Sequence, residues 1–211
     1  MKFEIPRKYN VMPLTQDDRN FFKFIYYVPL KKEHWEKGLD PHGAGVMRNA
    51  YKNRIKIYLQ QEQNNCCAYC GIGLEAFDNS HRDHIAPQSL YPQFIFRPDN
   101  IILACPRCNG LNKKNNADTI NNPVNKRYRK CDFNIVHPYF DNPSEHICYV
   151  GNDRGILIQS ITHKGRETIN IFELDSVYFT ETRAQCLAYS FHPLDEECER
   201  LKTEFLRSRT L

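Results

Sequence analysis

The sequence predicts an α+β protein in which a cysteine-rich centre lies between a helical N-terminal extension and a C-terminal extension of mixed hairpin and helix. Two observations predict this class. Apolar residues recur at helical spacing early in the chain, whereas short β-type runs occur in the centre and beyond it. With 211 residues, of which 41% are hydrophobic, the chain can form a domain with a real core, and its composition is neither disordered nor collagen-like.

The N-terminal extension, residues 1–63, is predicted to be helical. Thr15 is followed by two acidic residues, which is typical of a helix start, and Pro29 must end or bend the helix that follows. A second, amphipathic helix is expected over about 46–63, with an apolar face toward the core and a basic face exposed to solvent. Its apolar face comprises Met47, Tyr51, Ile55, Tyr58 and Leu59, and its basic face comprises Arg48, Lys52, Arg54 and Lys56.

The C-terminal extension, residues 126–211, is predicted to combine a β-hairpin with helices. The β-type runs 147–150 and 156–158 flank a turn rich in Gly, Asn and Asp, which is the pattern of a hairpin. Residues 181–189 contain good helix formers and no breaker, so a helix is expected there. A further helix is expected from a later apolar stripe, which consists of Leu194, Cys198, Leu201 and Phe205.

The sequence shows neither a secretory signal nor a membrane span. Its first residues lack an apolar region and a small-residue cleavage site. The most apolar early stretch, 21–30, is interrupted by Lys23 and Pro29 and is shorter than the roughly 18 residues that a span requires. We therefore expect a cytoplasmic protein with no membrane partner. Thiols stay reduced in that compartment, so the nine cysteines favour metal binding over disulfides.

Four of these cysteines form two Cys-x-x-Cys pairs in the central segment, residues 64–125. Two such pairs can supply four thiolates in a tetrahedral array, which is the arrangement that a structural Zn²⁺ prefers. Cys66 adjoins the first pair and could substitute for one of its members. The predicted zinc ligands are Cys67, Cys70, Cys105 and Cys108.

Residues suited to phosphodiester hydrolysis lie between and just after these pairs. Such hydrolysis requires a cation on the phosphate and a base for the attacking water. His84 suits the base because an imidazole titrates near neutrality. Asp83 and the amide oxygen of Asn109 suit Mg²⁺, or Mn²⁺ in its place, since this hard cation takes one or two protein oxygens and fills its other positions with water and phosphate. His81 has no assigned role and is expected to be solvated.

Together with Asn100 and the cysteine pairs, these residues resemble the motif of the HNH nucleases, a family with the ββα-metal fold. The resemblance covers about residues 66–116. It implies a zinc-stabilised ββα-metal (HNH) core in which Asp83, His84 and Asn109 act in catalysis with a divalent metal ion. It also implies that Asn100 holds the loop between the two strands and orients the catalytic histidine.

Basic residues gather just beyond this motif. They could neutralise phosphates and raise the local concentration of nucleic acid, although a solvated loop is the alternative. The net charge of +4 permits a nucleic-acid partner without requiring one. The predicted nucleic-acid-binding residues are Lys113, Lys114, Lys126, Arg127, Arg129 and Lys130.

The C-terminal extension resembles that of bacterial HNH proteins found with retrons and in Septu-type antiphage systems. The similar segments are 137–147 and 164–169, together with Arg183. This resemblance implies a role in antiphage defence beside a partner ATPase, with the two extensions serving as docking surfaces.

The combined patterns predict a metal-dependent HNH endonuclease that acts on nucleic acid, with DNA as the favoured substrate. RNA, for example a tRNA, is an alternative substrate, because the motif recognises a phosphodiester and carries little information about the sugar. A catalytically silent zinc module that binds nucleic acid or a partner is a second alternative. Such a module has no use for Asp83, His84 and Asn109 together, which favours the enzyme.

Overall fold

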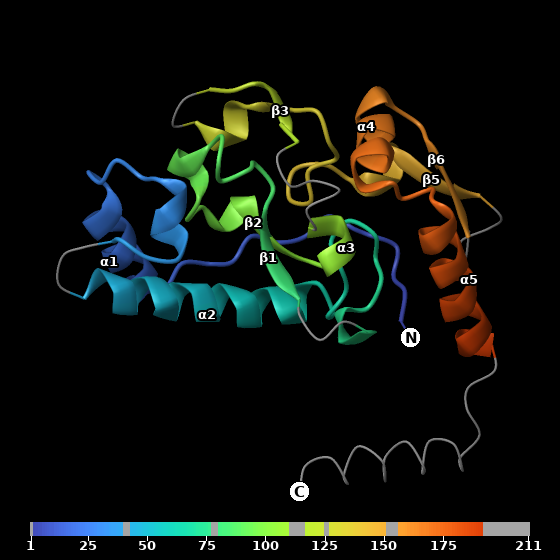
Figure 1. Ribbon diagram of the computed structural model, residues 1–211, viewed down its shortest axis with the longest axis horizontal. Helices are drawn as coiled ribbons and strands as arrows, with labels where there is room; N and C mark the ends of the chain where they lie inside the picture. The colour runs from blue at the N-terminus through green and yellow to red at the C-terminus, as the bar shows by residue number, and fades with distance from the viewer. Residues whose placement is uncertain are drawn as a thin grey trace, which may run out of the picture.

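The computed structural model describes residues 2–39, 43–76, 80–109, 117–124, 127–150 and 156–191 (Figure 1). Helices and strands are mixed along this part of the chain, as the predicted fold class requires. The helices are α1 (Gln16–Ile25), α2 (Ala44–Glu62), α3 (Pro106–Asn109), α4 (His163–Phe172) and α5 (Val177–Phe191). The strands are β1 (His81–His84), β2 (Ile101–Ala104), β3 (Ile120–Asn122), β4 (Asp132–Phe133), β5 (Ile147–Val150) and β6 (Leu157–Ser160).

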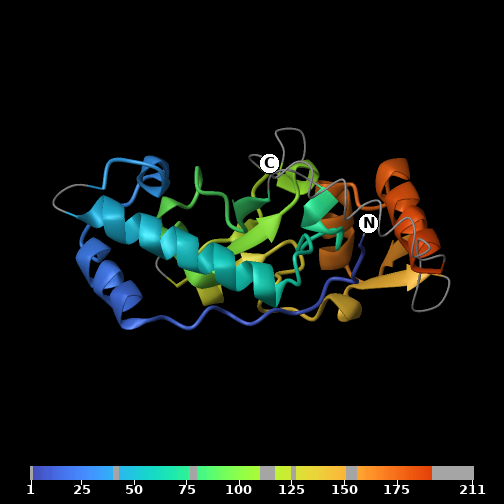
Figure 2. The same ribbon diagram turned by 90° about the horizontal axis from the view of Figure 1, so that it is seen from below.

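The strands form three separate two-stranded antiparallel sheets. In the first sheet, β1 pairs with β2 so that His81 lies opposite Ala104 and His84 opposite Ile101. β3 pairs with β4, and β5 with β6, which confirms the predicted hairpin; its turn, 151–155, lies outside the described residues. The β1–β2 sheet and α3 occupy the middle of the molecule, with α1 at one end and α4 and α5 at the other (Figures 1 and 2). α2 runs from the α1 end to the middle, alongside the β1–β2 sheet (Figure 1).

α1 begins where the sequence predicted a helix start. The Thr15 side chain accepts a hydrogen bond from the backbone N–H of Asp18, and the Asp18 carboxylate accepts one from the backbone N–H of Thr15. The Asp18 side chain is fully buried and forms an ion pair with Arg54 of α2. Burial alone would raise the pKa of Asp18, but the hydrogen bonds from Arg54 and Thr15 outweigh it and hold the pKa below its usual value. The ion pair between Asp18 and Arg54 therefore links α1 to α2.

α2 covers the predicted second helix, but part of its basic face is buried, contrary to the expectation of a solvated face. Arg48 and Lys52 are only 8% and 6% exposed. The Lys52 Nζ donates to the carbonyl oxygen of Trp35 at 3.0 Å and lies 4.7 Å from the centre of the Trp35 ring. The cause is tertiary, because the 3₁₀ turn Lys32–Trp35 covers this face. Helical periodicity within α2 carries no information about such a cover.

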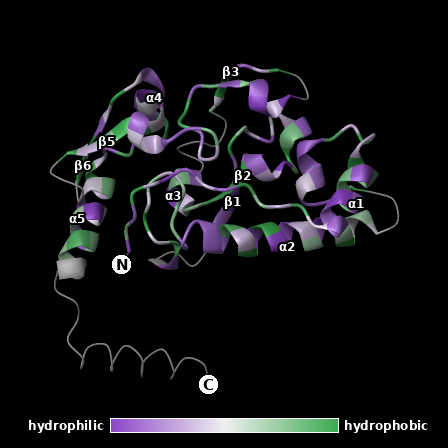
Figure 3. Ribbon diagram, turned by 180° about the vertical axis from the view of Figure 1, so that it is seen from behind, coloured by the Kyte–Doolittle hydropathy of each residue, from purple (hydrophilic) through white to green (hydrophobic). Residues whose placement is uncertain are grey.

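The hydrophobic core extends through all three predicted segments. Phe21 of α1 contacts Tyr51 of α2 with ring centroids 5.7 Å apart, and Phe172 of α4 belongs to the same buried cluster. Figure 3 shows hydrophobic and hydrophilic residues interleaved along α2, as expected of a helix that buries one face. The expected domain boundaries, after residues 63 and 125, stay predictions.

The C-terminal extension contains one helix that the sequence patterns did not predict. α4 begins after Thr162, whose hydroxyl accepts a hydrogen bond from the backbone N–H of Gly165 at 3.1 Å. Gly165 lies so close to the carbonyl oxygen of His146 that a Cβ there would collide with it. α5 includes the predicted helix over 181–189, whereas the later stripe over 194–205 lies outside the described residues. None of the described helices is both long and apolar enough to cross a membrane.

The buried Asp18 contact predicts a measurable stability difference. Asp18→Asn should lower the free energy of unfolding at pH 7 by about 1.5–3 kcal/mol, because hydrogen bonds to a buried charge are lost. Asp17→Asn, at an exposed position one residue earlier, is the matched control and should change stability little. Since the pKa of Asp18 is lowered in the folded protein, the wild-type advantage should shrink as the pH falls below about 4. Urea unfolding at pH 7 and pH 3 measures both effects, and equal stabilities of the two variants would contradict the assignment.

Candidate active site and cysteine cluster

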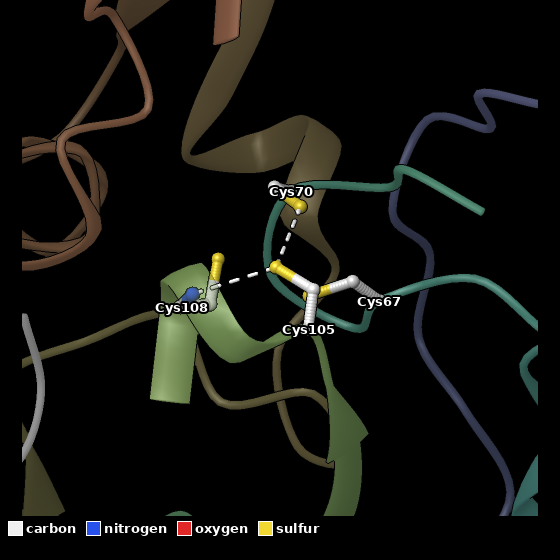
Figure 4. Close-up of side chains that lie close together, drawn as sticks. All are labelled: Cys67, Cys70, Cys105 and Cys108. Carbon is white, nitrogen blue, oxygen red and sulfur yellow. Dashed lines mark hydrogen bonds between the residues drawn. The ribbon is translucent and has the colours of Figure 1, made fainter. Parts of the chain in front are cut away.

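Four buried cysteine side chains converge beside the β1–β2 sheet (Figure 4). Their ligand atoms all lie within 4.8 Å of one another, and the Sγ atoms of two of them, Cys70 and Cys105, are 3.8 Å apart. Tetrahedral Zn²⁺ with bonds of about 2.3 Å would hold its sulfur ligands about 3.8 Å apart. The donor set therefore fits a tetrahedral metal ion. The four members are Cys67, Cys70, Cys105 and Cys108.

Burial and hydrogen bonds make the thiols of this cluster unequal. Burial raises the pKa of Cys70 and of Cys108, while hydrogen bonds from neighbouring thiols, Cys108 first, lower the pKa of Cys105. A metal ion would replace this uneven sharing of protons by stabilising all of the thiolates. Cys66 is buried outside the cluster, and its backbone pairs with Gly73 in an isolated β-bridge.

The second cysteine pair also fixes the start of α3. The backbone N–H of Cys108 points at the Sγ of Cys105 at 3.4 Å, and the backbone N–H of Asn109 donates to the Cys105 carbonyl at 3.0 Å. The Nδ2 of Asn109 lies 3.2 Å from the Nδ1 of His81, at the start of β1. Residues two apart on a strand point to the same face, so His81 and Asp83 share one face of β1. Asn109 therefore lies over the strand face that carries Asp83.

Asp83 is held in place by the first cysteine pair. It lies opposite Ile102 in the sheet and is 7% exposed. The Oη of Tyr69, a residue inside that pair, donates a hydrogen bond to the Asp83 Oδ2 at 2.6 Å. The Tyr69 ring in turn stacks on Phe172 of α4 with centroids 3.9 Å apart. The cysteine cluster and the α4 helix together fix the donor that orients this carboxylate.

His84, the last residue of β1, has a defined tautomer. Its Nε2 lies 2.9 Å from the carbonyl oxygen of Ile95, which can only accept, so Nε2 carries the hydrogen. In the neutral ring the lone pair is then on Nδ1. The edge of the ring packs nearly perpendicular to Trp35, with centroids 4.6 Å apart. Trp35 comes from the N-terminal extension, which therefore forms one wall of the site.

Asn100 makes the contacts that a loop-holding role requires. Its Oδ1 accepts from the backbone N–H of Ala86 at 2.7 Å, and its Nδ2 donates to the carbonyl oxygen of Phe94 at 3.0 Å. Ala86 and Phe94 both belong to the segment between β1 and β2.

Asn100 also receives a hydrogen bond from the C-terminal extension. Its Oδ1 accepts from the hydroxyl of Tyr128 at 2.8 Å, and that hydroxyl lies 2.9 Å from the Nε2 of His137. The backbone N–H of Tyr139 donates to the Nδ1 of His137, so Nε2 is the protonated nitrogen of the neutral ring and donates to Tyr128.

The predicted nucleic-acid-binding segment is described only in part. Arg127 and Lys130 are exposed. Arg129 donates to the buried carboxylate of Asp99 at 2.9 Å, and the same carboxylate pairs with Arg97. Arg129 is thus engaged in an ion pair, and a phosphate-binding role for this segment stays a prediction. Three members lie outside the described residues, namely Lys113, Lys114 and Lys126.

Several residues that hold the site were missed by sequence reasoning. Tyr69 lies inside a cysteine pair, and His137 begins a segment that resembles other bacterial HNH proteins, so weak signals existed for both. Trp35 and Tyr128 gave none, because a buried aromatic residue is ordinarily a core residue. His81 is exposed, as expected, but it contacts Asn109. Contacts between remote segments give these residues their place in the site.

The end of the β1–β2 sheet thus combines three kinds of group. Asp83 and Asn109 present a carboxylate and an amide over one strand face, and His84 adds an imidazole with its lone pair on Nδ1. Carboxylate and amide oxygens suit a hard divalent cation, and a neutral imidazole can accept a proton near pH 7. This set has the chemistry required for metal-assisted hydrolysis of an anionic ester.

Comparison with known proteins agrees with this chemistry. Residues 67–117 match the family model for HNH endonuclease. The Septu protein PtuB of Bacillus thuringiensis is 30% identical over 132 residues, which cover 60% of this chain and 43% of that relative. The Septu protein PtuB of Bacillus mycoides (strain KBAB4) is 26% identical over 156 residues, covering 64% of this chain and 52% of that relative. The matched part of the chain therefore spans about half the length of these curated relatives. Residues 67–117 are thus similar to the HNH endonuclease family, within a chain that is similar to Septu PtuB proteins.

Proposed function

We propose that this protein is a metal-dependent endonuclease that hydrolyses phosphodiester bonds, with DNA as its favoured substrate. The observation that carries the proposal is the fixed His84 tautomer beside Asp83 and Asn109 within the matched HNH domain. RNA is the alternative substrate, because none of these three groups distinguishes a ribose from a deoxyribose.

Each residue has one role in the proposed reaction. His84 accepts the proton of the attacking water on Nδ1, while the carbonyl of Ile95 holds Nε2 and fixes the ring. Asp83 and Asn109 would hold a catalytic Mg²⁺ or Mn²⁺, which would neutralise charge on the phosphate. Asn100 holds the loop behind His84, because it bridges Ala86 and Phe94. His84 is only 5% exposed, so bulk water has limited access to the ring.

We further propose that the cysteine cluster binds a structural Zn²⁺, and that the protein acts in antiphage defence beside a partner ATPase in the cytoplasm. The zinc proposal rests on four buried thiols whose sulfur atoms lie within 4.8 Å of one another, with one pair 3.8 Å apart. The defence proposal rests on the similarity to Septu PtuB proteins. It also rests on the resemblance of the C-terminal segments to those of bacterial HNH proteins from retron and Septu-type systems. The N- and C-terminal extensions are the proposed docking surfaces for that partner.

A cysteine variant tests the zinc proposal. Cys108→Ser should lose about one zinc per chain and destabilise the β1–β2–α3 unit, because a structural zinc contributes directly to the free energy of folding. Cys148→Ser, at a partly buried cysteine of β5 outside the cluster, should keep its zinc. Elemental analysis and thermal melting give the two readouts. Well-folded wild-type protein without zinc would end this proposal.

Substitution of His84 tests the catalytic proposal. His84→Ala should reduce cleavage of supercoiled plasmid by roughly 10²–10⁴-fold, since general-base assistance is worth about this much. Asp83→Ala should be comparably impaired, but extra Mg²⁺ or Mn²⁺ should restore part of its activity and none of that of His84→Ala. His163→Ala, at an exposed histidine of α4, is the control.

Parallel reactions on plasmid and on total RNA, each with and without added Mg²⁺ or Mn²⁺, decide the substrate. Full activity of His84→Ala in a preparation free of contaminating nuclease would refute the assigned roles. The catalytically silent binding module would then be the better interpretation.

The hydrogen bond between Tyr69 and Asp83 gives a third prediction. Tyr69→Phe removes the donor that orients the carboxylate, so half-maximal cleavage should need roughly tenfold more Mg²⁺. Burial holds the pKa of Tyr69 well above its usual value, so the wild-type hydroxyl remains a donor at neutral pH. Tyr91→Phe removes a similar hydrogen bond to Asp118, a carboxylate outside the proposed site, and should leave the Mg²⁺ requirement unchanged. Identical Mg²⁺ curves for the two variants would show that Tyr69 has no such role.

A further inference from the structure

A cluster of positive charge lies on the opposite face of β1 from Asp83. Arg82 and His84 are two residues apart on the strand, so their side chains share a face. The Nη1 of Arg82 donates to the carbonyl oxygen of Lys52 in α2 at 3.0 Å. The Arg82 guanidinium lies 5.8 Å from the centre of the Trp35 ring, which also contacts His84. We call Arg48, Lys52 and Arg82 the cationic cluster.

The cationic cluster contains more positive than negative charge. The Lys52 Nζ pairs with Glu36 at 2.9 Å, and the Glu36 side chain is 70% exposed. Arg48 donates to the side-chain oxygen of Asn49, a neutral acceptor. Among the residues that the structure describes, Glu36 is the one carboxylate that pairs with the cluster. Within the described part of the chain, Glu36 pairs with Lys52 alone, and Arg48 and Arg82 have no ionic partner.

This imbalance is costly in the protein alone. Arg48 and Lys52 are one helical turn apart, and like charges at that spacing repel each other. Burial, together with the charges of Arg82 and Arg48, lowers the pKa of Lys52 despite its contact with Glu36. A polyanion placed at the cluster would relieve this repulsion, and a planar guanidinium such as that of Arg82 matches the oxygens of a phosphate.

We propose that the cationic cluster binds a backbone phosphate of the nucleic acid whose neighbouring phosphodiester is presented to His84. This inference rests on the proposed nuclease function and deepens it by naming a binding site for the substrate. Trp35 links the two groups, because it contacts both Arg82 and His84. Nucleic acid is favoured over an acidic protein because the cluster shares its strand face with the proposed general base. The site differs from the basic segment around residues 113–130.

Binding measurements without added divalent cation test this proposal on the full-length chain. The probes are a short fluorescein-labelled DNA duplex and an RNA duplex of the same sequence, titrated at several salt concentrations. Arg82→Gln should weaken binding roughly tenfold and reduce the slope of log K against log salt by about 0.9, because one phosphate contact is lost. Arg166→Gln, at an exposed arginine of α4, is the matched control and should behave like wild type.

Substitution of Glu36 gives the opposite and more decisive result. Glu36→Gln removes the carboxylate that competes with phosphate for Lys52, so it should tighten binding several-fold, which a misfolded variant would not do. Glu33→Gln, at an exposed glutamate in the 3₁₀ turn that ends just before Glu36, should have a smaller effect. If Glu36→Gln binds no more tightly than Glu33→Gln, and Arg82→Gln binds as tightly as Arg166→Gln, the cationic cluster is not a substrate site. Plasmid cleavage by the wild type would still support the nuclease proposal in that case. If wild type binds neither duplex, both proposals fail.

Discussion

Four cysteine sulfur atoms, gathered within 4.8 Å of one another, join two segments that are far apart in the sequence. The first cysteine pair carries Tyr69, whose hydroxyl orients Asp83, and the second pair begins the helix that carries Asn109. Both groups proposed to hold the catalytic cation are therefore positioned by the same cluster. A ββα unit of this size buries little apolar surface by itself, so we expect its geometry to depend on the proposed metal ion at this cluster and on the extensions packed around it.

A second constraint comes from a buried chain of hydrogen bonds. His137 donates to Tyr128, Tyr128 donates to Asn100, and Asn100 bridges the loop behind His84. Each donor in this series of hydrogen bonds meets an acceptor. A buried polar group left without its partner would lower the free energy of unfolding by about 1–3 kcal/mol. These hydrogen bonds begin in the C-terminal extension, so that extension directly supports the loop between β1 and β2.

The alternation of side chains along β1 separates two kinds of charge. Asp83 points to the face of Asn109 and the cysteine cluster, whereas Arg82 and His84 share the face covered by Trp35. The strand separates these groups because successive residues of an extended chain point in opposite directions. Asp83 and His84 are adjacent at the end of β1, so one strand supplies both the proposed cation ligand and the proposed general base.

Much of the site could be predicted from the sequence because its chemistry lies in short motifs. The two Cys-x-x-Cys pairs, Asp83-His84 and the asparagine after the second pair each fix a residue type at a fixed spacing, and local geometry then restricts what they can do. The capped start of α1 and the β5–β6 hairpin were predictable for the same local reason. Only the tertiary structure decided that Lys52 is buried under Trp35 and that Tyr69 reaches Asp83. These contacts join segments remote in sequence, and periodicity reports which face of an element is apolar without reporting what covers the other face.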